Sequence, residues 1–347
     1  MKISKIFNLG KSQAELDFVD IDISRDTPLF LEPSFLAKRN DKWSIDASRT
    51  IKSYFQFVID LIRAKRIDEA KILFDYLHEP NSTCLGLSKG RPQGKGVGRQ
   101  NTDDIFDSII KSKAIITGLI RDLEDNIIFV DGFGRDKLSD MTTNIIKKHL
   151  IQYTQHQCQL NNIDLSHDVP SGYFWEISSN DWENVYTDML IIDNRKILLV
   201  PKGIVSYSDD YTPEKYYNHF VLNFLQSEHL RMNSALIQNK RDGTPYVTKK
   251  SIKEKVELEI EQSNSNIKGF LREFTKKHPQ VFENFKIETK TSSLEQYEFE
   301  IQNIDNIVKY LITKLETIDS GNDEATSYHR CITGILELLF YPHLIMY

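Results

Sequence analysis

Apolar residues at helical spacing recur through most of this 347-residue chain, and no other feature constrains its fold as strongly. A helix is expected over 48–65, with Ser48 as its N-cap and one apolar face formed by Ile51, Phe55, Val58, Ile59 and Ile62. A second helix over 67–77 would form a hairpin with the first. The same spacing predicts helices over 101–111, 139–161, 212–224, 248–262, 267–285 with a bend near Pro279, 305–315 and 323–341.

Strand signals are fewer and shorter. One or two short strands are expected within 14–36, broken at Pro28, and a short buried strand over 126–130. Asp193 and Asn194 lie between two apolar runs, which predicts a β-hairpin, whereas 165–181 is expected to be a loop. The sequence therefore predicts an α+β fold that is helix-rich with small β elements and several subdomains.

Five segments follow from these elements. They are an N-terminal α+β segment (1–80), a glycine-rich basic loop plus helices (81–165), a β-hairpin and helical segment (166–262), a linker-like helical segment (263–300) and C-terminal helices (301–347).

Composition excludes several classes of protein. With 44 Lys and Arg against 50 Asp and Glu, the net charge is -6, so the chain is not basic throughout, although a local basic patch could still bind nucleic acid. Three cysteines lie far apart, which is neither a disulfide framework nor a zinc pattern and favours a reducing cytoplasm. No run approaches the roughly 20 apolar residues that span a bilayer, so we expect a cytoplasmic protein with no membrane partner.

A glycine-rich stretch over 86–99 carries cations and no acid. Glycines let backbone N–H groups approach an anion closely, and a predicted helix N-terminus follows, so a phosphate or a nucleic-acid backbone is the expected ligand. The stretch is neither a Walker A loop nor a dinucleotide fingerprint, and a solvated flexible loop is the alternative. The candidate phosphate-binding residues are Lys89, Arg91, Gly94, Lys95, Gly96, Gly98 and Arg99.

Two groups of acids could hold a divalent metal ion. Asp20 and Asp22 would share one face of a strand, and Asp136 and Asp140 follow the turn at 131–135. These four carboxylates are the candidate metal ligands, while turn and helix-cap chemistry is the alternative for both groups.

Other constellations favour structure over chemistry. His149 and His156 share a helix face, but the further ligands that zinc needs are not nearby in the sequence. The aromatic residues over 207–224 could stack on bases, although such a stripe at helical spacing is more often core. Two Glu-x-Lys tripeptides, at 69–71 and 288–290, arise easily by chance in a charged chain.

Short segments from DIDISRDTPLFLEP at 20–33 to TIDSGND at 317–323 follow one another along nearly the whole chain, and in this order they resemble a group of prokaryotic proteins from restriction and phage-defence settings, which carry a nuclease domain of the PD-(D/E)XK class. The resemblance begins with DIDISRDTPLFLEP at 20–33. It continues at 85–90, 94–98, 112–118, 136–146, 150–155, 197–202, 216–222, 247–250 and 317–323.

The resemblance implies a DNA partner, a deoxyribonuclease activity in the family and Mg²⁺ as its cofactor. In that family the metal-binding Asp and Glu-x-Lys follow the segment that matches 328–342, whereas this chain ends at Tyr347, so the catalytic residues have no counterparts here. The expectation is a truncated member, a DNA-engaging module without the catalytic core. Whether it is an enzyme is left open.

Two alternatives stay open beside this reading. One is a metal-dependent phosphodiester enzyme that uses the acidic residues named above. The other is a non-catalytic interaction protein that pairs with a partner or with itself through its apolar C-terminus, which contains Leu336, Leu339, Phe340 and Leu344.

Overall fold

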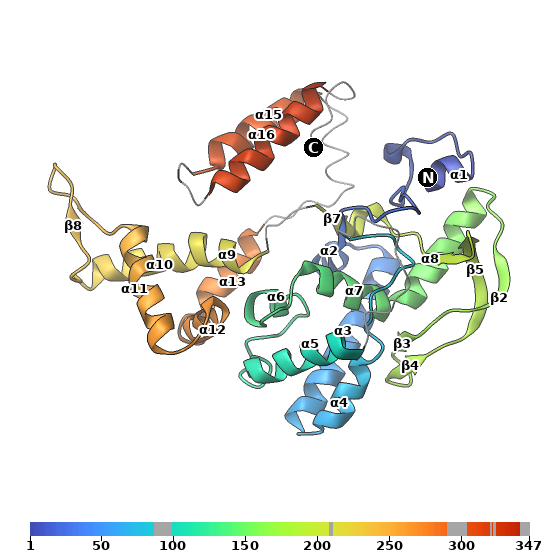
Figure 1. Ribbon diagram of the computed structural model, residues 1–347, viewed down its shortest axis with the longest axis horizontal. Coiled ribbons are helices and arrows are strands. Elements are labelled where there is room, and N and C mark those ends of the chain that lie inside the picture. Colours follow the sequence, from blue (N-terminus) through green and yellow to red (C-terminus); the bar gives the residue numbers. More distant parts are fainter. Residues whose placement is uncertain (87–98, 208–210, 290–303, 320, 322–323, 341–347) are drawn as a thin grey trace. The chain divides into compact units, whose positions relative to one another are not determined.

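The computed structural model describes residues 1–86, 99–207, 211–289, 304–319, 321 and 324–340 (Figure 1). Within these ranges the side chains of 14, 99–102, 304–310, 330, 333–334 and 336–340 are not described. The chain divides into two compact units, Met1–Ser293 and Leu294–Tyr347. Helices dominate and every sheet is small and antiparallel, which confirms the predicted helix-rich α+β class.

The N-terminal stretch forms less strand than the alternating sequence predicts. Its elements are α1 (Ile3–Ile6), the 3-10 turn η1 (Gln13–Glu15), β1 (Phe30–Leu31) and α2 (Pro33–Lys38). Strand β1 pairs with β7 (Val205–Ser206), and elsewhere in this stretch only isolated bridges form, such as Phe18 with Pro201. Phe18, Val19, Asp20 and Ile21 are nonetheless all buried, so this stretch is an extended segment enclosed on both sides rather than a strand with one solvent-facing side.

Helices α3 (Lys42–Arg63) and α4 (Ile67–Phe74) form the predicted hairpin, and α2 packs against α3. The expected start at Ser48 is wrong by six residues. Asp41 is the N-cap, because its carboxylate accepts the backbone N–H of Ser44 at 2.9 Å. Lys65 adopts a φ of 61°, a left-handed conformation that ends the first helix and turns the chain into the second.

The expected strand over 126–130 is wrong, because this run forms α6 (Asp125–Phe129) after α5 (Arg99–Ser112). A short apolar run fits a buried strand and a buried helix equally well. Asp125 decides between them locally. Its carboxylate accepts the backbone N–H groups of Arg121 and Asp122, and these bonds hold the turn from which the helix starts.

The single helix expected over 139–161 is two helices, α7 (Arg135–Ile145) and α8 (Lys147–Leu160), which meet at Ile146. The hydroxyls of Thr142 and Thr143 each donate to the carbonyl four residues earlier, at 2.7 and 2.8 Å. Such bonds compete with the helical ladder and favour a bend here, but Thr50 makes the same kind of bond inside the unbroken α3, so they contribute to the break without being sufficient for it.

Small antiparallel sheets follow α8. Strands β2 (Ser166–Pro170), β5 (Tyr186–Ile192) and β6 (Arg195–Ile197) form one sheet in the order β2-β5-β6. The predicted hairpin is confirmed, and its turn residues Asp193 and Asn194 have φ values of 48° and 61°. The loop expected over 165–181 is wrong, because it contains β2, β3 (Phe174–Glu176) and the start of β4 (Asp181–Glu183).

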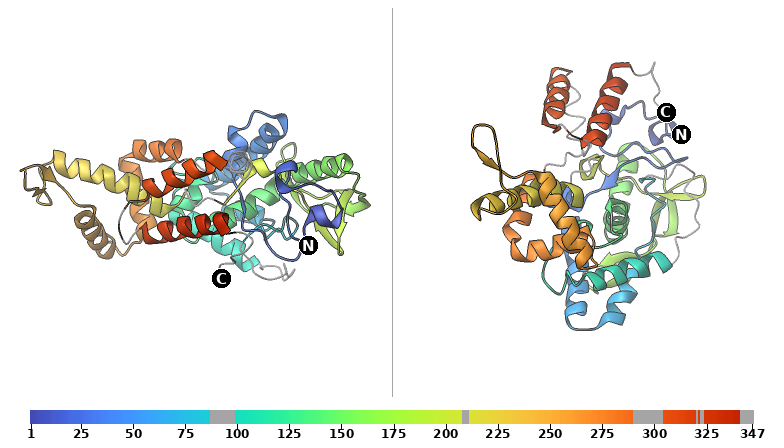
Figure 2. Two further views of the ribbon diagram at one scale, coloured as in Figure 1. Left: turned by 90° about the horizontal axis from the view of Figure 1, so that it is seen from above. Right: turned by 60° about the vertical axis from the view of Figure 1, so that its left-hand side comes forward.

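A helical segment completes the first unit. Its elements are α9 (Pro213–Lys215), the π-helical turn η3 (Tyr216–Val221), α10 (Leu222–Arg231), β8 (Gln238–Asn239), β9 (Pro245–Tyr246), α11 (Lys249–Gln262), α12 (Ile267–Lys277) and α13 (Pro279–Glu288). The predicted bend near Pro279 is confirmed as the boundary between α12 and α13. Figures 1 and 2 show the β8–β9 hairpin extending away from α10 and α11.

The second unit is a pair of helices, α15 (Ile304–Thr317) and α16 (Ala325–Phe340), which pack against each other. Both predicted C-terminal helices are therefore confirmed. The side chains of Leu336, Leu339 and Phe340 and the whole of Leu344 lie outside the described residues, so the expected apolar association surface is not described. Among the helices that the structure describes, none is long and apolar enough to cross a membrane.

Candidate functional site

The glycine-rich basic stretch lies almost wholly outside the described residues. Residues 87–98, which include Lys89, Arg91, Gly94, Lys95, Gly96 and Gly98, are not described. The structure does describe both ends of the stretch. It follows Gly86, which has a φ of +134°, and Arg99 is the first residue of α5, a helix of 14 residues with no acid in its first turn. The predicted order of basic stretch and helix N-terminus is confirmed, with the helix starting two residues earlier than expected.

Asp20 and Asp22, two of the four candidate metal ligands, are engaged by the start of the chain. Asp20 is buried and accepts the backbone N–H and the hydroxyl of Ser4 at 2.8 and 2.7 Å. Asp22 pairs with the N-terminal ammonium group and accepts the hydroxyl of Ser24. Burial opposes ionisation, but these donors and the ammonium charge hold the pKa of Asp22 well below its ordinary value. Both carboxylates therefore fasten the N-terminal segment.

Asp136 and Asp140 lie in a different group of acids, beside the point where the glycine-rich stretch begins. Carboxylate oxygens of Asp136 and Asp26 would each be 3.7 Å from a Cβ placed on Gly86. Burial, followed by the charges of Asp136, Glu79 and Asp26, raises the pKa of Asp140 to about 8. Burial also raises the pKa of Asp136. These carboxyl groups thus share one electrostatic environment.

The four candidate metal ligands do not form one site. In the part of the chain that the structure describes, no three His, Cys, Asp or Glu side chains come together in a way that could hold a metal ion. The acidic residues therefore do not fit a preformed Mg²⁺ site, and we derive no chemistry through a metal.

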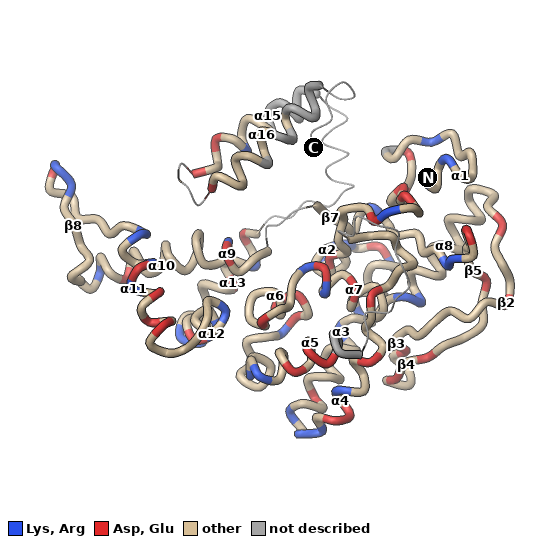
Figure 3. The backbone as a smooth tube through the Cα atoms, viewed as in Figure 1, with Lys and Arg blue, Asp and Glu red and all other residues tan. Residues whose placement is uncertain are grey.

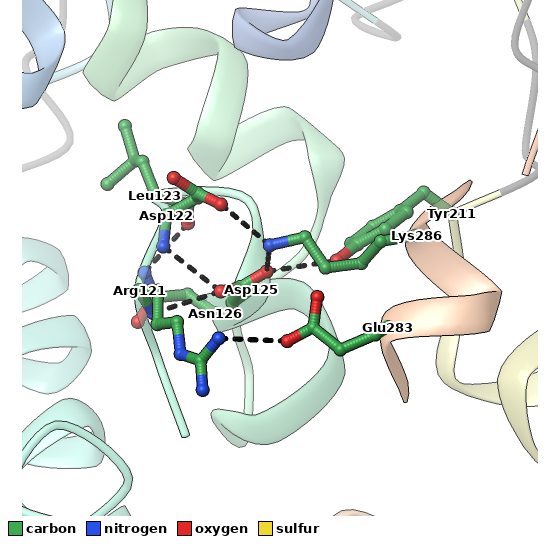
Figure 4. A network of polar contacts seen from close by, with 8 residues as sticks. All are labelled: Arg121, Asp122, Leu123, Asp125, Asn126, Tyr211, Glu283 and Lys286. Atoms are coloured by element: carbon green, nitrogen blue, oxygen red, sulfur yellow. Dashed lines mark hydrogen bonds and ion pairs between the residues drawn. The ribbon is translucent and has the colours of Figure 1, made fainter. Parts of the chain in front are cut away.

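A buried polar network joins α6 to the helical segment (Figure 4). The side chain of Asp125 is 1% exposed, and one of its oxygens accepts the two backbone N–H groups that start α6. The other oxygen accepts Lys286 Nζ at 2.8 Å and the Tyr211 hydroxyl at 3.0 Å. Asp122 also pairs with Lys286, at 2.6 Å. Four donors therefore satisfy the two oxygens of this buried carboxylate.

The charge state of Lys286 follows from these contacts. Burial alone would lower the pKa of its ammonium group, but the charge of Asp125 and the hydrogen bonds that the ammonium group donates to both carboxylates raise it above its ordinary value. Arg121 adds an exposed ion pair with Glu283 at 2.9 Å. Beside it, the Oδ1 atom of Asn126 is a buried oxygen with no hydrogen-bond partner among the described residues.

Helix α12 contributes further cations to the same region. Lys268 Nζ donates to the carbonyls of Val130 and Phe133 at 2.7 and 3.0 Å, and Arg272 donates to the carbonyl of Phe129 at 2.5 Å. These carbonyls belong to the end of α6 and the turn after it, where a helix has unpaired acceptors and a partial negative charge. The cations of α12 and α13 thus stabilise both ends of α6.

The aromatic residues over 207–224 contribute to this packing. Tyr211 lies 4.9 Å from Phe285 and Tyr216 lies 5.2 Å from Phe282, measured between ring centroids. Tyr216 is fully buried, and its hydroxyl shares a hydrogen bond with Thr275. The core reading of this stripe holds for these rings, and base stacking is excluded for Tyr216 because no face is accessible.

A basic surface that the sequence reasoning missed lies on the β8–β9 hairpin and the start of α11. Residues 231–255 contain seven Lys and Arg and two acids, in a chain whose net charge is -6. Lys240 and Arg241 form the hairpin turn, closed by the 2.9 Å bond from Gly243 N–H to the carbonyl of Lys240. Figure 3 shows blue at this tip. A count of charge in a sliding window, rather than a motif search, is the signal that finds it.

We define the basic surface by four cations, Lys240, Arg241, Lys250 and Lys255. All four are exposed, and none has an ion pair with another described residue. Lys249 differs, because its Nζ donates to the carbonyl of Asn218 at 2.9 Å. Burial and the charge of Lys255 lower the pKa of His229, which places Lys255 near α10.

Charges in α11 run against the helix dipole. Lys249 and Lys250 lie in its first turn, where no acid occurs, and Glu257, Glu259 and Glu261 follow toward its C-terminal end, where no base occurs. A charge of the wrong sign at a surface helix end costs about 0.3–1 kcal/mol. Since local conflicts of this kind concentrate at functional sites, the order of charges favours a role in binding over a role in folding.

The base of the hairpin is rigidly packed. Val247 directly follows β9 and belongs to a small core with Leu222, Ile252 and Val256, against which Leu236 and Ile237 pack just before β8. The carbonyl of Val247 accepts Gln226 at 2.7 Å, and Thr248 caps α11 by accepting the N–H of Ser251. The exposed cations therefore extend from a fixed scaffold.

Comparison with known proteins identifies one family. Residues 8–212 match the profile of a domain of unknown function, DUF8370, and the match ends immediately before α9. Searches of curated proteins and of solved structures each gave no significant match.

Proposed function

We propose that this chain, which belongs to the DUF8370 family, is a DNA-engaging module of a restriction or phage-defence system that works in the cytoplasm. The resemblance in motif order suggests this setting. The observation that carries the proposal is the stretch over 86–99, with its glycines, four cations and no acid, which continues directly into α5. Phosphate groups are the ligands that such a stretch and a helix N-terminus favour.

The charge of the whole chain is compatible with this role. A net charge of -6 would repel DNA if it were evenly spread, but affinity depends on local patches. Cations over 86–99 would neutralise phosphates and release counterions, so affinity should fall steeply as salt rises.

Catalysis is not part of this proposal. The resemblance implies Mg²⁺ and a deoxyribonuclease family, but the described carboxylates do not form a group that could hold a metal ion. We therefore assign no catalytic role to Asp20, Asp22, Asp136 or Asp140, and the metal-dependent phosphodiester alternative has no supporting geometry among the described residues.

Filter binding of a labelled duplex tests the proposal. The parent protein should bind at about 50 mM salt and lose affinity by orders of magnitude toward about 200 mM. A variant with Lys89→Gln, Arg91→Gln and Lys95→Gln should bind more weakly, whereas Lys52→Gln with Lys111→Gln, at exposed helical lysines, should match the parent. The absence of duplex binding by the parent protein at low salt would refute the proposal.

A further inference from the structure

The basic surface on the hairpin and α11 has a shape that suits one kind of polyanion. A two-stranded antiparallel ribbon, β8–β9, carries Lys240 and Arg241 at its turn and extends away from the helices (Figure 2). The major groove of B-form DNA is wide enough to admit a two-stranded β-ribbon. A ribbon whose turn is basic could thus enter the groove while its cations reach the phosphates on either side.

Helix α11 supplies a second set of cations at the base of the ribbon. Lys250 and Lys255 are exposed on it, and Val247 and Ile252 bury together in the core that joins the ribbon to the helix. The N-terminal end of α11 adds a partial positive charge to that of its lysines. The surface thus has cations both at the tip of the ribbon and on the helix that follows it, and each of them could neutralise a phosphate.

The hairpin turn itself argues against a membrane as the partner. Residues 240–244 are Lys, Arg, Asp, Gly and Thr, so the tip has no apolar side chain to insert among lipid chains. Its conformation is fixed, because Asp242 accepts the N–H of Thr244 at 2.9 Å and Gly243 adopts a φ of +83°. The glycine supplies the left-handed conformation that this turn needs.

We infer that the basic surface of Lys240, Arg241, Lys250 and Lys255 is a second DNA contact, with the β8–β9 ribbon lying in a groove of the duplex. This inference rests on the proposed DNA-engaging function and assigns part of it to a segment that follows the DUF8370 match. The surface is separate in sequence from the stretch over 86–99, so the two contacts are separable by mutation.

Two paired variants test the inference in the full chain, Lys240→Gln with Arg241→Gln and Lys250→Gln with Lys255→Gln. Each pair removes two phosphate contacts, so each should weaken duplex binding about tenfold or more at low salt. The matched control is Lys52→Gln with Lys111→Gln, which removes two exposed helical lysines elsewhere and should bind like the parent. Unchanged thermal unfolding midpoints would show that the variants are folded.

The outcomes separate this inference from the proposed function. If the parent binds duplex DNA and both paired variants bind as well as the control, the basic surface is not a DNA contact although the proposed function stands. If the parent does not bind duplex DNA, the inference and the proposed function are both refuted. Binding to phosphatidylserine vesicles that is lost in the paired variants, with duplex binding intact, would also overturn the inference.

Discussion

Two regions of the molecule use positive charge in opposite ways. Around α6, the cation Lys286 is largely buried and bonded to two carboxylates, at 2.6 and 2.8 Å. On the hairpin and α11, the four cations of the basic surface are exposed and form no ion pair within the described residues. Removing a charge from the first region should lower the free energy of unfolding, but its buried groups are not accessible to a binding partner. The exposed cations of the second region contribute little to stability and are accessible to a partner.

This difference teaches where function is to be sought. Paired charges in the interior are explained by the fold that they hold together. Lys250 is exposed in the first turn of α11, where its charge opposes the helix dipole, so the fold does not explain it and a ligand would. The following changes should break or sharpen the contrast, from the largest effect to the smallest.

Removal of the buried cation should have the largest effect. Lys286→Met leaves the carboxylate of Asp125 buried without its counter-charge, so the free energy of unfolding should fall by about 3–5 kcal/mol. The matched control is Lys276→Met on α12, because Lys276 pairs with Glu273 at the same 2.6 Å but on the surface, and its loss should cost less than about 1 kcal/mol. Urea unfolding measures both.

A double variant sharpens this result. Asp125→Asn removes the buried negative charge, so combined with Lys286→Met it should cost less than Lys286→Met alone. Equal losses for Lys286→Met and Lys276→Met would mean that burial does not distinguish the two regions.

Asp140→Asn should have the next largest effect on the free energy of unfolding, and this effect should depend on pH. The folded protein raises the pKa of Asp140 from 3.8 to about 8, so the folded state retains a proton that the unfolded state releases. The contribution of this group to stability is therefore complete below pH 3.8 and is lost as pH rises to about 8.

Asparagine does not ionise, so the variant should escape that loss. At pH 9 it should be more stable than the parent by more than about 1.4 kcal/mol, the equivalent of one pKa unit. Near pH 4 the two should be alike. Denaturation at both pH values checks this, and a difference that does not grow with pH would contradict the electrostatic environment described for Asp140.

Lys250→Glu should have the smallest effect on stability, and in the opposite direction from most substitutions. It places an acid in the first turn of α11, which should raise the free energy of unfolding by about 0.3–1 kcal/mol. The same change should weaken duplex binding more than Lys250→Gln does, because it adds repulsion. A loss of stability in Lys250→Glu would show that Lys250 has a structural role.

Much of the fold could be predicted because its signals are local. The hairpin at Asp193 and Asn194 needs two residues with positive φ, and these residue types tolerate it. The boundary between α12 and α13 follows from Pro279, which cannot continue a helix. The helix expected over 248–262 is α11, which begins at Lys249 for an equally local reason, because Thr248 accepts the N–H of Ser251.

The missed elements depend on side-chain hydrogen bonds that the spacing of apolar residues does not reveal. Helix α6 rests on Asp125, whose partner Lys286 lies 161 residues further along the chain. The break between α7 and α8 depends in part on the back-bonding of Thr142 and Thr143, which spacing of apolar residues ignores.

The candidate site also has one part that the sequence predicts and other parts that it does not. The stretch over 86–99 is visible as composition, and α5 does follow it. The two acidic groups are predicted as metal ligands from their chemistry alone, but the fold gives Asp20 and Asp136 neighbours that do not complete a metal site among the described residues. The excess of cations over 231–255 is visible in the sequence as charge, but the exposure of these cations and the core around Val247 that joins the ribbon to α11 are visible only in the structure.

The salt dependence of duplex binding tests the central claim most directly. For the parent protein and for the variant with all four cations of the basic surface changed to Gln, log K for one duplex is measured against log salt concentration. Each phosphate contact contributes about 0.9 to the slope, so the account predicts a slope shallower by about 3–4 in the quadruple variant, with an unchanged unfolding midpoint. Equal slopes for the two proteins would contradict it.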